Sequence, residues 1–65
     1  MLNDKQEKFA QAYVLHRNAT EAAKSAGYSA TSANNQGYRL IHIQEVLDRV
    51  SELEQELETN VSVIE

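Results

Sequence analysis

The sequence predicts an all-α protein in which a three-helix head containing a helix-turn-helix is followed by a longer, acidic C-terminal helix. The chain has 65 residues with no Pro and only two Gly, so residues that interrupt helices are rare. Apolar residues recur every three or four positions in successive segments, which is the spacing of helices with one buried face. A chain of this length buries little surface, so we expect one small domain.

The first predicted helix begins after Asn3 and ends near Leu15. The Asn3 side chain can accept a hydrogen bond from the first turn, and Gln6 occupies the position of a capping-box partner. Helical spacing gives this segment one apolar face, which comprises Phe9, Ala12, Tyr13 and His16. We expect His16 to be half-buried and to form a short link together with Arg17.

Residues 18–40 predict two short helices joined by a tight turn. Asn18 and Ser29 are N-cap candidates, and Gly27 lies where the first of these helices should end, because glycine tolerates left-handed backbone geometry. The predicted inward positions are Ala19, Ala22, Ala23 and Ala26, then Ala30, Ala33, Gly37, Leu40 and Ile41. Such small residues let two helices approach closely, which is the layout of a helix-turn-helix.

A fourth helix is expected from Ile43 or Gln44 to about Glu58. The corresponding division of the chain is a head at 1–42, a helical segment at 43–60 and a tail at 61–65, where apolar residues lose the helical phase. Four apolar residues spaced 4, 3 and 4 apart form a short seam: Val46, Val50, Leu53 and Leu57. This seam is a candidate oligomerisation surface, and it can equally serve to cover the head.

Charge is divided unevenly along the chain. Residues 1–42 carry five Lys or Arg against three Asp or Glu, which gives 5 − 3 = +2. Residues 43–65 carry one Arg against seven Asp or Glu, which gives 1 − 7 = −6, and the sum is the net −4 of the chain. A mildly basic head joined to an acidic segment indicates separate tasks for the two parts.

The outward face of the third helix is the candidate DNA-binding site. Helical winding puts polar residues opposite its small apolar face, namely Thr31, Ser32, Asn35, Tyr38 and Arg39. Asn35 can make a two-bond contact to adenine, and Arg39 can contact guanine or a phosphate. Further phosphate contacts are predicted for Lys5, Lys8, Arg17 and Lys24. The alternative is that these polar residues form only a solvated surface.

The chain opens with Leu2, Lys5, Gln6 and Phe9, which are followed by Tyr13, and its central block at 18–29 reads NATEAAKSAGYS. This arrangement resembles the N-terminal DNA-binding domain of the small terminase subunits of tailed bacteriophages. That family typically has Leu-Thr-x-Lys-Gln-x-x-Phe at its start and Asn-Ala-Thr-x-Ala-Ala-x-x-Ala-Gly-Tyr-Ser in its centre. The resemblance covers about residues 2–53. It departs at residues 43–44, where Ile-Gln stands in place of the Asn-Pro that many members carry.

The resemblance implies a role in packaging viral DNA. Members recognise DNA at the packaging start, assemble into rings and deliver the DNA to the large terminase subunit, which has the ATPase and the nuclease. Double-stranded DNA, the large subunit and further copies of the chain are therefore the expected partners. Members usually continue into a longer oligomerising region and a C-terminal segment that engages the large subunit, which these 65 residues do not include. A helix-turn-helix transcription regulator of prophage origin is the alternative function.

No motif in the chain predicts catalysis, a cofactor or a metal site. The chain has no Cys, and its two His, at positions 16 and 42, lack the His-Glu-x-x-His spacing of metal enzymes. No Gly-rich loop with a Lys is present to hold a nucleotide phosphate. No apolar run approaches the roughly 20 residues of a membrane span, and MLNDKQEKF is too polar for a signal peptide. We therefore expect a non-enzymatic protein that does not bind membranes, and the resemblance implies that it acts in the cytoplasm of the bacterial host.

Overall fold

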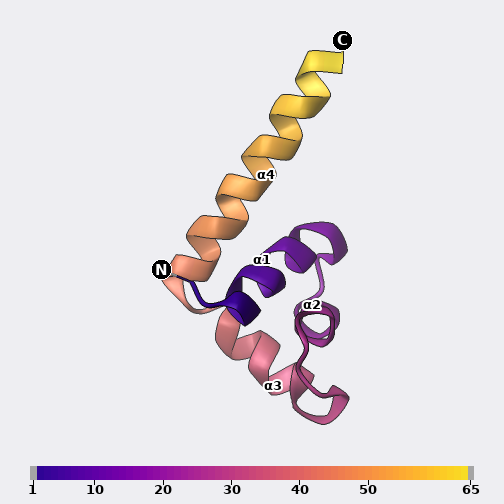
Figure 1. Ribbon diagram of the computed structural model, residues 1–65, viewed down its shortest axis with the longest axis vertical. Helices are drawn as coiled ribbons and strands as arrows, with labels where there is room; N and C mark the ends of the chain where they lie inside the picture. Colours follow the sequence, from indigo (N-terminus) through magenta and orange to yellow (C-terminus); the bar gives the residue numbers. More distant parts are fainter. Residues whose placement is uncertain (1, 65) are drawn as a thin grey trace.

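A computed structural model describes the backbone of residues 2–64 and the side chains of residues 2–57. It contains α1 (Asp4–His16), α2 (Ala19–Ala26), α3 (Ala30–Leu40) and α4 (Gln44–Ile64), which confirms the predicted all-α fold. Helices α1 to α3 form a head, and α4 projects from it as a long rod (Figure 1). The molecule accordingly measures 43 × 21 × 17 Å.

The predicted capping residues begin each helix of the head. The Asn3 Oδ1 accepts a hydrogen bond from the Gln6 backbone N–H at 2.8 Å, and the Gln6 Oε1 accepts one from the Asn3 N–H at 3.0 Å, which completes the capping box. Asn18 and Ser29 cap α2 and α3 through the N–H groups of the residues three positions on. These side chains satisfy N–H groups that the first helical turn leaves without a backbone partner.

Left-handed backbone conformations end α1 and α2. Gly27 has φ of 109°, and its N–H donates to the carbonyl groups of Ala23 and Lys24, as predicted for the end of α2. Arg17 has φ of 56° and ends α1, so this helix includes His16 and is slightly longer than expected. His16 is exposed, which corrects the expectation that it is half-buried.

Helix α1 lies between α2 and α4, and the hydrophobic core forms around it. Phe9 of α1 and Val46 of α4 are the largest side chains that are fully buried. Ala10 and Val14 of α1 are also buried, although the predicted apolar face did not include them. Helix α1 therefore has two buried faces, because it contacts a helix on each side.

Gly37 marks the closest approach of α2 and α3. A Cβ atom at this position would lie 2.5 Å from the Ala19 carbonyl oxygen and 3.1 Å from the Ala19 Cβ. The prediction that small residues bring these two helices together is therefore confirmed at this point. Ala33 and Leu40 of α3 are buried as expected, whereas Ala30, the first residue of α3, is exposed.

The fourth helix is longer than the sequence predicted. It begins at Gln44 as expected but continues past Glu58 to Ile64, so most of the predicted tail at 61–65 continues the helical backbone. The chain after Gln44 has no Gly or Pro to interrupt the helix, which explains why the loss of apolar phase did not end it.

Candidate nucleic-acid interface

The outward face of α3 is a polar stripe that the other helices leave uncovered. Thr31, Asn35, Tyr38 and Arg39 are all exposed, and 56% of the Tyr38 surface is accessible. Ser32 is half-buried because its hydroxyl and its N–H are engaged with Ser29 at the helix start. The stripe therefore presents an amide, a phenol and a guanidinium side by side on one helix face.

Close packing between α2 and α3 fixes the position of this stripe. The contact between Gly37 and Ala19 sets the separation of the two helices. A hydrogen bond of 3.2 Å from the Thr20 Oγ1 to the Asn34 Oδ1 links their exposed edges. Two short helices joined through Gly27 in this way form the helix-turn-helix that the sequence predicted, with α3 as its second helix.

The C-terminal end of α3 carries a stacked aromatic pair. The rings of Tyr38 and His42 lie with their centroids 4.6 Å apart and their planes inclined by 19°. The His42 Nδ1 lies 2.7 Å from the Tyr38 carbonyl oxygen. Together with Arg39, these two residues line a shallow hollow at the protein surface. Helical periodicity did not group His42 with the predicted DNA contacts, because it lies in the turn after α3.

The five cationic residues of the head fall into two groups, which differ in whether the side chain interacts with a neighbouring charged or aromatic group. Arg17 pairs with Glu54 of α4, Lys24 pairs with Glu21 at 3.3 Å, and the Lys5 Nζ lies 4.7 Å from the centroid of the Tyr28 ring. Within residues 2–57, Lys8 and Arg39 make no ion pair or hydrogen bond through their side chains. Arg39 is thus a cation on the α3 stripe whose charge is not offset by a neighbouring carboxylate.

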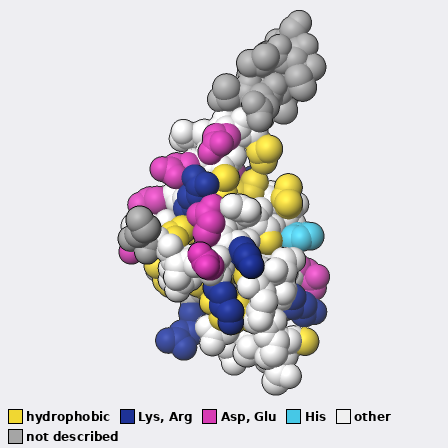
Figure 2. Space-filling model, viewed as in Figure 1, with side chains coloured by type: hydrophobic (Ala, Val, Ile, Leu, Met, Phe, Trp, Pro, Cys, Tyr) yellow, Lys and Arg dark blue, Asp and Glu magenta, His cyan; other side chains and the backbone are white. Residues whose placement is uncertain are grey.

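The charges also separate in space on the face shown in Figure 2. Acidic side chains gather on its upper part, whereas most Lys and Arg side chains lie lower, over the head. On this face, the distribution agrees with the division of charge along the chain.

A comparison with protein families identifies the chain. The sequence model of the terminase small subunit family matches residues 2–64. The chain belongs to this family. The resemblance seen in the sequence is thereby confirmed, and the protein is a small subunit of the terminase type, related to the packaging of bacteriophage DNA. Searches of curated proteins and of solved structures gave no match.

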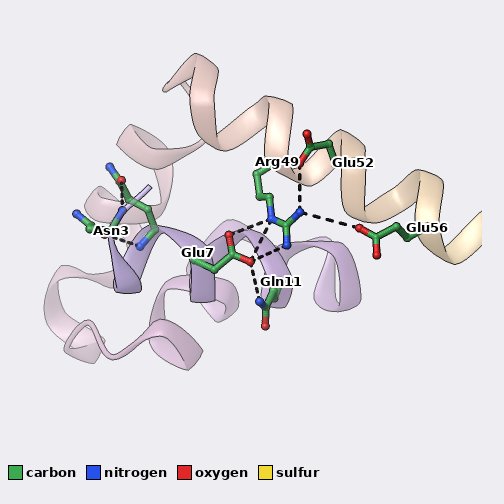
Figure 3. A network of polar contacts seen from close by, with 7 residues as sticks. Asn3, Glu7, Gln11, Arg49, Glu52 and Glu56 are labelled. Atoms are coloured by element: carbon green, nitrogen blue, oxygen red, sulfur yellow. Dashed lines mark hydrogen bonds and ion pairs between the residues drawn. The ribbon is translucent and has the colours of Figure 1, made fainter. Parts of the chain in front are cut away.

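An ionic network fixes α4 on the head (Figure 3). The Arg49 guanidinium of α4 donates to both carboxylate oxygens of Glu7 on α1, through Nε at 3.0 and 3.1 Å and through Nη2 at 3.0 Å. Its Nη1 donates to Glu52 at 3.1 Å and lies 4.0 Å from Glu56. Gln11 donates to the Glu7 Oε2 at 2.7 Å.

This network shifts the pKa values of the two charged groups at its centre, Glu7 and Arg49. Hydrogen bonds from Arg49 and Gln11 lower the pKa of Glu7, and the hydrogen bonds to Glu7 and Glu52 raise the pKa of Arg49. The sequence indicated that Arg49 belongs to the acidic segment but not that it binds Glu7, because the two residues are far apart in the chain. The network orients α4 on α1 and lies apart from the α3 stripe.

The apolar seam of α4 is divided between the core and the surface. Val46 and Val50 are buried, with exposed fractions of 0% and 5%, so these two residues cover the head. Leu53 is half-buried, and Leu57 is 46% exposed. Leu53 and Leu57 line an apolar groove of about 300 Å³ with Val14 and Leu15 of α1.

Among the described residues, no group of three or more His, Cys, Asp or Glu side chains could hold a metal ion. No helix within the described part is both long enough and apolar enough to span a membrane.

Proposed function

We propose that this terminase small subunit recognises viral DNA at the packaging start by placing α3 in the major groove. It then delivers the DNA to the large terminase subunit and does no chemistry itself. The observation that carries the proposal is the exposed pair of Asn35 and Arg39 on a helix that Gly37 holds firmly against α2. This activity takes place where phage DNA is packaged, in the cytoplasm of the bacterial host.

The chemistry of the stripe suits major-groove recognition. An Asn amide can donate to and accept from adenine at once, and an Arg guanidinium can donate twice to guanine or to a phosphate. In a helix-turn-helix, residues near the start of the recognition helix contact base edges. Thr31, Ser32 and Asn35 lie in the first half of α3, and we assign them to the bases and adjacent phosphates. Tyr38 and Arg39, in its second half, also reach the DNA.

The cations of the head supply attraction that does not depend on sequence. Lys8 has no acidic partner in the described structure, whereas Arg17 and Lys24 must exchange Glu54 and Glu21 for phosphates. Lys5 can move from the Tyr28 ring to the DNA backbone. With a net charge of only +2 on the head, one copy should bind weakly and lose affinity steeply as salt increases.

Assembly of several copies would compensate for this weak binding. Heads linked in one assembly bind DNA with an avidity that exceeds the affinity of each head. We propose that homo-oligomers form through the outer end of the α4 seam, which comprises the half-buried Leu53 and the exposed Leu57. Val46 and Val50 contribute indirectly by holding α4 on the head, because they are buried within the chain.

Fluorescence anisotropy with a labelled duplex carrying the packaging start, at about 50 mM salt, tests the proposal. Asn35→Ala should weaken binding by about tenfold, since a good two-bond contact to a base provides roughly 1–3 kcal/mol of discrimination. Arg39→Ala should weaken it by a similar factor, because it removes a cation that contacts a base or a phosphate. Gln55→Ala is the matched control, because Gln55 is exposed on α4 away from the stripe, and it should bind as the unmodified chain does. Equal affinity of all four proteins would overturn the assignment of α3.

A second experiment separates packaging from transcription control. Genomic fragments bound by the protein in infected cells are recovered and sequenced. Enrichment of the packaging start supports the terminase role, whereas enrichment of promoter operators would support a prophage regulator instead.

A further inference from the structure

His42 offers a DNA contact that the proposed stripe does not include. Its side chain is exposed and stacks on Tyr38 at the end of α3, beside Arg39. The turn after α3 holds it there, because the His42 N–H donates to the Arg39 carbonyl at 3.1 Å. The imidazole is therefore fixed at the same end of the helix as the phenol and the guanidinium.

The hydrogen bond at Nδ1 determines which nitrogen of the ring can change its proton. A backbone carbonyl only accepts hydrogen bonds, so the Nδ1 that lies 2.7 Å from the Tyr38 oxygen must carry a proton. The neutral ring consequently has its lone pair at Nε2. Adding a proton to Nε2 turns this nitrogen from an acceptor into a charged donor.

The hollow lined by Tyr38, Arg39 and His42 has the composition of an anion site. It presents a guanidinium, a phenol and an imidazole, and its lining includes no carboxylate. The titratable side chains facing His42 in this hollow are those of Tyr38 and Arg39, and from the other elements no described carboxylate lies within ion-pair distance of the ring. The end of α3 carries partial negative charge, so an anion can bind there only if cationic side chains outweigh it.

We propose that this hollow binds one phosphate of the DNA backbone, with Arg39 and the protonated His42 as its donors. The inference rests on the proposed DNA recognition by α3 and assigns its C-terminal end to the backbone rather than to a base. When DNA binds, a neutral His42 takes up one proton from water at Nε2. When the DNA is released, His42 returns this proton to water. DNA affinity consequently rises as the pH falls through the range in which histidine becomes charged.

The test measures DNA affinity by anisotropy at pH 5.5, 6.5 and 8.0 at constant ionic strength, with His42→Gln and a matched control. Glutamine can still donate to the Tyr38 carbonyl, but it cannot take up a proton. His16→Gln is the control, because positions 16 and 42 are the two histidines of the chain and His16 is exposed on α1. Thermal unfolding of each variant establishes that it is folded at the assay temperature.

The unmodified chain should bind more tightly by about tenfold or more at pH 5.5 than at pH 8.0, which is the change expected for one charge-assisted hydrogen bond. The loss of DNA affinity with increasing salt should also be steeper at pH 5.5, by about the slope that one additional phosphate contact adds. His42→Gln should lose both differences, and His16→Gln should keep them. If His42→Gln retains the full pH response, the phosphate site is wrong while DNA recognition by α3 stands. If the unmodified chain binds DNA at no pH, both proposals fail.

Discussion

Replacing Gly37 with Ala tests the close contact on which the helix-turn-helix depends. The added Cβ would lie 2.5 Å from the Ala19 carbonyl oxygen and 2.8 Å from its carbonyl carbon, and real Cβ atoms essentially never come within 3.0 Å of another group. The two helices must therefore separate by at least about 0.5 Å, because both close contacts are to backbone atoms that cannot rotate away.

The expected loss of stability in Gly37→Ala follows from two opposing effects. Alanine favours a helix interior over glycine by about 1 kcal/mol, whereas overpacking a close contact costs about 1–3 kcal/mol. Because backbone atoms form the obstacle at Gly37, we take the upper part of that range and expect a net loss of about 1–2 kcal/mol. In a domain of this size, such a loss lowers the melting temperature by roughly 4–16 °C.

Circular dichroism at 222 nm, followed during heating, measures the effect. The helical signal of Gly37→Ala at low temperature should match that of the unmodified chain, because the substitution moves α3 without removing it. Adding Ala19→Gly should restore little stability, since it removes only the 3.1 Å contact with the Ala19 Cβ and leaves the carbonyl in place. A melting temperature of Gly37→Ala equal to or above that of the unmodified chain would refute this account of the contact.

Three further predictions concern the rest of the fold. Because Arg49 lowers the pKa of Glu7 below 4.5, the ionised Glu7 contributes stability that is fully present above pH 4.5 and is lost as the pH falls through the lowered value. Melting curves between pH 7 and 2 should therefore show a larger acid-induced loss for the unmodified chain than for Glu7→Gln, and parallel losses would contradict the network. Asn18→Ala should reduce the free energy of unfolding by about 1 kcal/mol in urea titrations, because the Glu21 N–H loses its acceptor; an unchanged midpoint would show that the cap is dispensable. Sedimentation at several concentrations should show self-association that Leu57→Gln weakens, whereas a strict monomer at all concentrations would reject assembly through this fragment.

The elements of the head could be predicted from sequence because their signals are local. Asn3, Asn18 and Ser29 bind N–H groups three residues away, and Gly27 adopts a conformation that few other residues tolerate. The Ala and Gly pattern of 18–40 likewise indicated which faces meet, and the contact at Gly37 agrees with it.

Features that depend on long-range contacts were not visible in the sequence. The burial of Val14 follows from the packing of α4 on α1, and the bond between Glu7 and Arg49 joins two helices that are distant in the chain. The stack of His42 on Tyr38 depends on the turn after α3, whose geometry periodicity does not describe. The DNA contacts at Thr31, Ser32, Asn35, Tyr38 and Arg39 remain predictions. The structure shows that four of these side chains are exposed, and exposure alone does not identify a ligand.

The most direct measurement is a titration of the ¹⁵N-labelled protein with the packaging-start duplex, followed residue by residue in ¹H–¹⁵N NMR spectra. Contact through the outward face of α3 predicts that the largest shift changes fall between residues 31 and 42, together with the side-chain amide of Asn35. Shift changes confined to α4 would contradict DNA recognition by α3. The same conclusion would follow if no shifts changed at duplex concentrations that saturate the anisotropy signal.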